Sequence, residues 1–147
     1  MKGWINMICS KILVAYDESE LALKSLEKAI ELAKLDPAIE IHAIHAVTLP
    51  IHPSIYGNAF QEIEESMLKY GEEVISKADA LLSEIPNKTQ TFVVEGSAIK
   101  TLLEHAKSQN CDLIIMGSRG LSGFKEFLGS VSHYIVQNSP VPVLLVK

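Results

Sequence analysis

Short apolar runs alternate along the chain with longer segments whose apolar residues recur at helical spacing, and this alternation restricts the fold more than any other feature. The apolar runs are interpreted as strands, and they cover residues 11–16, 39–47, 89–95, 111–116 and 141–146. Strands that lack polar alternation are typical of a parallel sheet covered on both faces. The sequence therefore predicts a layered α/β protein.

Helices are predicted between successive strands, where apolar residues recur at steps of three and four. The pattern covers residues 19–34 and 60–85, the segment after Gly96, and a short stretch over 130–138. Strict alternation of strands and helices implies right-handed crossovers. We predict a single domain over residues 1–147, with an open, parallel, five-stranded, Rossmann-like sheet in the order 3-2-1-4-5, flanked by helices.

Composition excludes several classes of function. The net charge of −5 disfavours nucleic acid as a partner, because proteins that grip a phosphate backbone usually carry a basic surface. No stretch of about 18 uncharged apolar residues is present, so no membrane span is predicted. The first ten residues lack a cleavage pattern, which predicts a cytoplasmic protein whose Cys9 and Cys111 stay reduced.

Glycines stand at both ends of the loop that follows the fourth predicted strand. Gly117 and Gly120 leave the strand, and Gly129 with Ser130 opens the next helix. Ligands of parallel α/β sheets bind beyond the carboxyl ends of the strands, where the N-terminus of a helix attracts anions. Glycine also lets the backbone approach a phosphate chain closely. The loop is therefore the predicted phosphate site.

At these residues the chain resembles the universal stress protein family, whose nucleotide-binding members carry Gly-x-x-Gly, nine residues and then Gly-Ser or Gly-Thr. Here Gly117-Ser-Arg-Gly120 is followed by eight residues before Gly129-Ser130. The resemblance implies an ATP-binding stress-response module, with Mg²⁺, that acts as a nucleotide-dependent switch. It also implies the ligand contacts: Ala15, Asp17 and Val47 for adenosine, and Met116, Gly117, Arg119, Gly120, Gly129, Ser130 and Val131 for ribose and phosphates.

Several of these residues also have simpler interpretations. Asp17 precedes a helix, with Glu20 three residues on, and would suit a helix cap. Arg119 would also suit an exposed loop. No spacing among the histidines fits a metal site, so each is expected to be a strand, loop or helix-surface residue; they are His42, His45, His52, His105 and His133.

The last predicted strand, Val141 to Val146, suits the edge of a sheet, because Pro142 lacks a donor for the ladder. Family resemblance implies a homodimer in which this strand pairs with its copy. Two alternatives stay open. One is a slow ATP hydrolase, although residues 15–19 hold no glycine for a phosphate loop. The other is a dimeric interaction protein that binds no nucleotide, which the eight-residue interval favours and the three glycines oppose.

Overall fold

The protein forms a five-stranded parallel sheet in the order β3-β2-β1-β4-β5. The structure, a computed structural model, describes residues 9–49, 54, 57–119 and 129–147. The strands are β1 (Lys11–Ala15), β2 (Glu40–Val47), β3 (Thr89–Glu95), β4 (Leu113–Gly117) and β5 (Val143–Val146). The predicted fold class and strand order are confirmed.

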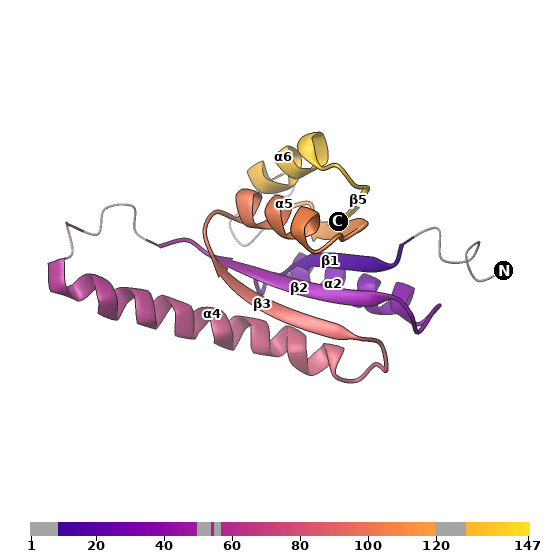
Figure 1. Ribbon diagram of the computed structural model, residues 1–147, viewed down its shortest axis with the longest axis horizontal. Coiled ribbons are helices and arrows are strands. Elements are labelled where there is room, and N and C mark those ends of the chain that lie inside the picture. The colour runs from indigo at the N-terminus through magenta and orange to yellow at the C-terminus, as the bar shows by residue number, and fades with distance from the viewer. Residues whose placement is uncertain (1–8, 50–53, 55–56, 120–128) are drawn as a thin grey trace.

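Helices cover both faces of the sheet (Figure 1). They are α2 (Glu20–Ala33), α4 (Phe60–Leu82), α5 (Ala98–Ser108) and α6 (Ser130–Asn138), with a short 3₁₀ turn η1 (Gly57–Ala59) before α4. One apolar cluster joins the sheet to α2 and α4, and a second joins it to α5 and α6. No helix among the described residues combines the length and apolar character that crossing a membrane requires.

β1 lies at the centre of the sheet, and its composition explains why. Ile12, Leu13 and Val14 are all fully buried. Ile12 and Val14 face α2 and α4, whereas Leu13 belongs to the cluster under α5 and α6. Alternate side chains of a strand point to opposite faces, so an uninterrupted apolar run supplies both layers of the core.

β5 begins two residues later than predicted, because the N–H of Val141 bonds locally and Pro142 has no N–H. Val141 donates its N–H to the hydroxyl of Ser139 at 3.1 Å. Pro142 has no N–H, but its carbonyl accepts the N–H of Ile114 at 3.0 Å. The regular ladder with β4 therefore starts at Val143.

Asn87 ties together three chain segments at the amino end of the sheet. Its side-chain amide donates to the carbonyl groups of Ala33, Asp36 and Ile39, at 3.0, 3.0 and 2.9 Å. The side chain is buried, and the carbonyls belong to the end of α2 and the turn that leads into β2. One side chain thus satisfies acceptors that helix and strand hydrogen bonds leave open.

Asn87→Ala is expected to lower the free energy of unfolding by about 2 kcal/mol, because three carbonyls lose the amide donor that they share. Urea denaturation followed by circular dichroism measures the change. Asn138→Ala is the matched control, since the amide of Asn138 makes a single exposed bond to the Tyr134 carbonyl, at 2.9 Å. Equal losses for the two variants would contradict the role given to Asn87.

Candidate functional site

The carboxyl ends of β1, β2 and β4 meet at one edge of the sheet, since all the strands are parallel. Ala15, Val47 and Gly117 are the final residues of these strands. Val47 is buried and Ala15 is half-buried. The structure thus brings residues from three separate parts of the sequence to the edge where ligands of α/β sheets bind.

Asp17 lies in the turn between β1 and α2. Its Oδ1 atom accepts a hydrogen bond of 3.0 Å from the N–H of Ser19. Ser19, not Asp17, is the N-cap of α2, and its hydroxyl accepts the N–H of Ala22 at 3.1 Å. The interpretation of Asp17 as the helix cap is therefore wrong, and Asp17 shapes the turn that leads to the cap.

Glu18, the next residue, holds a strained backbone conformation, with φ at 71°. A non-glycine residue in this region costs about 1–2 kcal/mol. Its carboxylate pairs with Lys77 of α4 and accepts the hydroxyl of Tyr70 at 3.4 Å. The hydrogen bond from Lys77 holds the pKa of Glu18 below its ordinary value. These contacts tie the turn after β1 to α4.

Gly117 ends β4 where the first turn of α2 passes close to it. A Cβ atom on Gly117 would lie 2.7 Å from the Cβ of Leu21 and 3.1 Å from the carbonyl oxygen of Arg119. Neither neighbour is the end of a flexible side chain. Glycine is thus required here by packing, whether or not a ligand is bound.

The start of α6 is fixed to the segment that follows β4. Gly129 is the N-cap of α6, and its N–H donates to the carbonyl of Ser118 at 2.7 Å. The hydroxyl of Ser132 donates to the same carbonyl at 2.8 Å and to the carbonyl of Gly129 at 3.0 Å. Two ends of the glycine loop are therefore held together, although eight residues separate Gly120 from Gly129.

The first turn of α6 has no side-chain cap among the described residues. The N–H groups of a first helical turn have no partner within the helix, and they attract anions. Ser130 is exposed and Val131 is half-buried at this position. Arg119, also half-buried, is in the segment held beside Gly129, whose Cβ position is 3.2 Å from the Arg119 Cα. The backbone of Arg119 thus lies beside the backbone donors of the first turn of α6.

Not all predicted contact residues present a side chain to this edge. Met116 is buried in the apolar cluster under α5 and α6. Gly120 lies outside the described residues. Ser118 and Ser132, which join the two ends of the loop, were not predicted as site residues. The sequence did carry a signal for Ser132, which is the third residue of α6, because a hydroxyl at that position can reach back toward the cap.

A hollow of about 340 Å³ adjoins this edge, between the end of β2 and α4. Val47, Thr48, Met67 and Tyr70 are among its lining residues. Its walls include Val47 of the predicted adenosine contacts, but neither Gly117 nor Gly129. It is thus a separate hollow between β2 and α4 and not part of the glycine loop.

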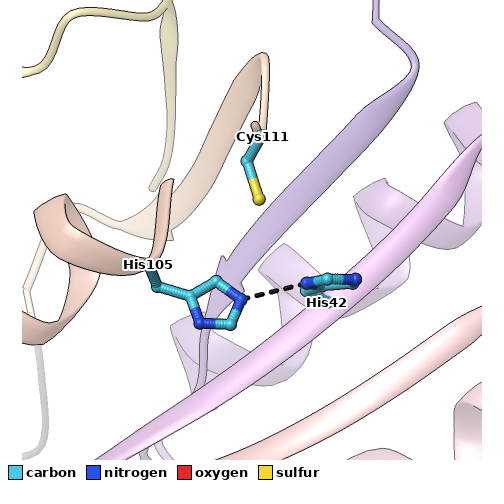
Figure 2. A group of neighbouring side chains, drawn as sticks. All are labelled: His42, His105 and Cys111. Carbon is cyan, nitrogen blue, oxygen red and sulfur yellow. Dashed lines mark hydrogen bonds between the residues drawn. The ribbon is translucent and has the colours of Figure 1, made fainter. Parts of the chain in front are cut away.

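A second group of chemically active side chains lies away from this edge. His42 of β2, His105 of α5 and Cys111, which precedes β4, form a buried cluster (Figure 2). We call these three residues the histidine–cysteine cluster. Burial lowers the pKa of His42 and lowers that of His105 to about 4, with His42 adding to the effect on His105. Sequence spacing did not indicate this grouping, because its members come from three elements.

Stability should fall with acidification through this cluster. His105 has a pKa of about 4 in the folded protein, against 6.5 as its ordinary value. Between these values the unfolded chain binds more protons, so the free energy of unfolding decreases as the pH drops, by about 1 kcal/mol per pH unit. Above pH 6.5 the contribution is fully present. Urea denaturation at several pH values between 7 and 4 measures it.

The groups around His105 define the control for this prediction. His42 contacts His105, Cys111 lies beside both rings, Lys11 acts on His105 by its charge, and Glu40 bonds to His42. All four remain in His105→Gln, which should flatten the slope. His133→Gln changes an exposed histidine and should leave the slope unchanged. An unchanged slope in His105→Gln would contradict the assignment.

Comparisons with known proteins agree with this architecture. The family model described as "Universal stress protein family" matches residues 9–147. The Universal stress protein YxiE of Bacillus subtilis is 35% identical over an alignment of 147 positions, which covers 94% of this chain and 99% of that protein. Among solved structures, MJ0577 of Methanocaldococcus jannaschii aligns with a TM-score of 0.83 and 27% identity, over 94% of this chain and 95% of that one.

A third similar protein carries a ligand in its solved structure. It is a universal stress protein family protein from Arabidopsis thaliana, At3g01520, with AMP bound. It aligns with a TM-score of 0.70 and 20% identity, over 94% of this chain and 91% of that one. At this identity the likeness shows a shared fold.

Proposed function

The chain belongs to the universal stress protein family, and from that premise we propose that it binds an adenine nucleotide, ATP with Mg²⁺, at the carboxyl edge of its sheet. The observation that carries the proposal is the junction of β4 and α6. There Ser118, Gly129 and Ser132 hold an uncapped helix N-terminus against the end of a strand. A fixed row of N–H donors suits a chain of phosphoryl oxygens.

Each predicted contact has a specific part in this proposal. The backbone N–H groups of Ser130 and Val131 bind the phosphates, Gly117, Gly120 and Gly129 let the chain come close to them, and Arg119 supplies a positive charge. Oδ1 of Asp17 keeps its hydrogen bond from the N–H of Ser19, and the second carboxylate oxygen accepts a hydrogen bond from the nucleoside. Ala15, Val47 and the backbone of Met116 line the adenosine end. AMP in the Arabidopsis protein supports an adenine nucleotide as the class of ligand.

We also propose that the protein acts as a homodimeric switch through β5. This strand is at the edge of the sheet, and within the part of the chain that the structure describes it pairs only with β4. Leu144, on β5, keeps 41% of its surface exposed. A second copy of the strand, related by a two-fold axis, would form hydrogen bonds with the open backbone edge of β5 and would cover the Leu144 side chain. The nucleotide state would then alter the surface that the dimer presents.

Leu144→Lys is expected to shift the protein from dimer to monomer, weakening association by at least tenfold. The reason is that two lysines would meet across the two-fold axis in place of an apolar contact. Light scattering after gel filtration measures the mass. Leu35→Lys is the matched control, because Leu35 is 75% exposed and lies at the end of α2. A stable dimer in Leu144→Lys would place the interface elsewhere.

Nucleotide binding is tested first on protein purified without added nucleotide. The protein is denatured, and the supernatant is analysed for ATP, ADP and AMP. Calorimetric titration with ATP, with and without Mg²⁺, then gives the affinity. Retained or titratable ATP supports the proposal. Turnover well above background would favour a slow hydrolase.

The eight-residue interval between Gly120 and Gly129 favours one competing function, a dimeric interaction module without a nucleotide. Absence of both binding and turnover, in protein that circular dichroism shows to be folded, would contradict the nucleotide proposal and leave that alternative. Retained binding would show that the shorter interval still admits the phosphate chain.

A further inference from the structure

The histidine–cysteine cluster places three metal-ligating atoms together inside the protein. Nδ1 of His42 is 2.9 Å from Nε2 of His105, and these atoms and Sγ of Cys111 all lie within 4.8 Å of one another. The exposed fractions are 1% for His42, 9% for His105 and 3% for Cys111. In Figure 2 the thiol of Cys111 and the facing nitrogens of the two rings converge on one space.

Local structure fixes two of the three side chains relative to each other. α5 ends at Ser108, and Asn110, two residues on, takes the left-handed conformation with φ at 55°. The N–H of Cys111 then donates to the carbonyl of Ala106 at 2.9 Å, and that of Asn110 to the carbonyl of Lys107 at 3.4 Å. This is the Schellman arrangement, which folds the chain back over the last helical turn. It returns Cys111 toward His105.

The sheet supplies the third side chain and holds its orientation. His42 pairs in register with Leu13 of β1, whose side chain belongs to the cluster under α5 and α6. Phe92 of β3 packs against both imidazole rings, with centroid separations of 5.1 Å to His42 and 4.5 Å to His105. The rings thus sit in an apolar shell that limits their rotation.

Glu40 sets the tautomer of His42. Its Oε2 atom lies 2.6 Å from Nε2 of His42, so that nitrogen donates to the carboxylate and Nδ1 keeps its lone pair. Burial alone would raise the pKa of Glu40, but His42, Lys11 and Lys88 together lower it. A carboxylate behind a histidine is the usual second-shell support for a metal ligand.

We propose that His42, His105 and Cys111 bind a thiophilic d¹⁰ metal ion, Zn²⁺ or Cu⁺, through Nδ1, Nε2 and Sγ, with Glu40 orienting His42. Imidazole and thiolate are ligands of both ions. In a tetrahedral zinc site two such nitrogens lie about 3.3 Å apart, so the rings separate slightly and the sulfur moves inward by roughly 1 Å. The fourth position takes a water molecule or a small anion.

Charge and proton balance are consistent with this site. Metal binding requires the thiolate, so the proton of Cys111 leaves to solvent. The proton on Nε2 of His105 moves to Nδ1, which leaves the charge of that ring unchanged. One proton is therefore released for each ion bound. The thiolate and the Glu40 carboxylate together offset the two charges of Zn²⁺.

A simpler interpretation assigns the cluster to the core alone. In that case Glu40, His42 and His105 form a chain of hydrogen bonds and the thiol only fills space. The two interpretations differ in one measurable respect, since only a metal site makes the sulfur a ligand.

The cluster is independent of the proposed nucleotide function. Glu40 and Cys111 lie at the amino ends of β2 and β4, whereas the glycine loop follows the carboxyl end of β4. Loss of one site should therefore leave the other intact, and a result that contradicts the metal proposal would not contradict the nucleotide proposal, or the reverse.

The test is titration of the reduced, nucleotide-free, full-length protein with Co²⁺, which reports thiolate coordination by charge-transfer absorption in the near ultraviolet. One equivalent per chain is expected to produce this absorption. Zn²⁺ and Cu⁺, each added separately under anaerobic conditions, should abolish it by displacement, and their relative affinities distinguish the two ions. Absence of the absorption in folded protein would overturn the proposal.

Matched variants locate the sulfur and the nitrogen ligands. Cys111→Ser should remove the absorption and weaken Zn²⁺ binding by at least 100-fold. Cys9→Ser, a second buried thiol in the cluster under α2 and α4, should retain both. His105→Gln should weaken binding similarly, whereas His133→Gln, at an exposed position, should not. Absorption that survives in Cys111→Ser, or is lost in Cys9→Ser, would place the metal elsewhere and refute the assignment.

Discussion

Arg119→Glu is expected to weaken ATP binding by about 100-fold, equivalent to about 2.7 kcal/mol at 25 °C. Arg119 is half-buried beside the start of α6, where the phosphates are proposed to bind. Charge reversal removes a charge-assisted hydrogen bond and adds repulsion at a position partly shielded from water. Calorimetric titration with ATP measures the loss.

Two comparisons separate a phosphate contact from a general effect of charge. Adenosine, which has no phosphate, should bind the variant and the parent protein with similar affinity. Lys34→Glu reverses the charge of an exposed residue at the carboxyl end of α2, away from the proposed site, and should leave ATP affinity within about twofold. If the two charge reversals weaken ATP equally, Arg119 is not a phosphate contact.

Gly117→Val is expected to lower the free energy of unfolding by about 3 kcal/mol, the upper part of the range for an overpacked site. Its Cβ atom would meet the Cβ of Leu21 at 2.7 Å, and Leu21 is itself buried. To relieve the contact, α2 must move away from β4. Such a shift would also displace the turn that holds Asp17, so ATP affinity should fall together with stability.

Substitution with alanine at two glycines tests this packing argument within one chain. At Gly129 an added Cβ would lie 3.2 Å from the Arg119 Cα, and the backbone there, with φ at −63°, suits any residue. Gly117→Ala should therefore cost more stability than Gly129→Ala in urea denaturation. The reverse order would show that Leu21 yields easily and that the contact at Gly117 is not limiting.

The architecture could be predicted from sequence because local pattern and tertiary environment agree. Ile12 to Val14 form a run that is apolar on both faces, and β1 occupies the centre of the sheet. Element ends were less predictable. α4 stops at Leu82 rather than Ile85, because the next N–H groups, those of Glu84 and Ile85, bond to carbonyls three residues back.

The candidate site was only partly predictable, for a physical reason. Glycines at 117 and 129 are visible in the sequence, but the bonds from Ser132 to Ser118 depend on where α6 docks. The histidine–cysteine cluster depends likewise on the register of β2 and on the left-handed turn at Asn110. Such contacts join residues up to 69 positions apart, from His42 to Cys111, and no local spacing records them.

The last bond of the sheet has a consequence for regulation. The carbonyl of Val146, on the edge strand, accepts the N–H of Ser118 at 2.9 Å, and Ser118 in turn holds the start of α6. A self-association site and an anion site would then share one rigid junction. By thermodynamic linkage, the factor by which dimerisation strengthens nucleotide binding equals the factor by which the nucleotide strengthens dimerisation. If the proposed dimer binds ATP more tightly than the monomer does, protein concentration acts as an effector, and dilution weakens ATP binding.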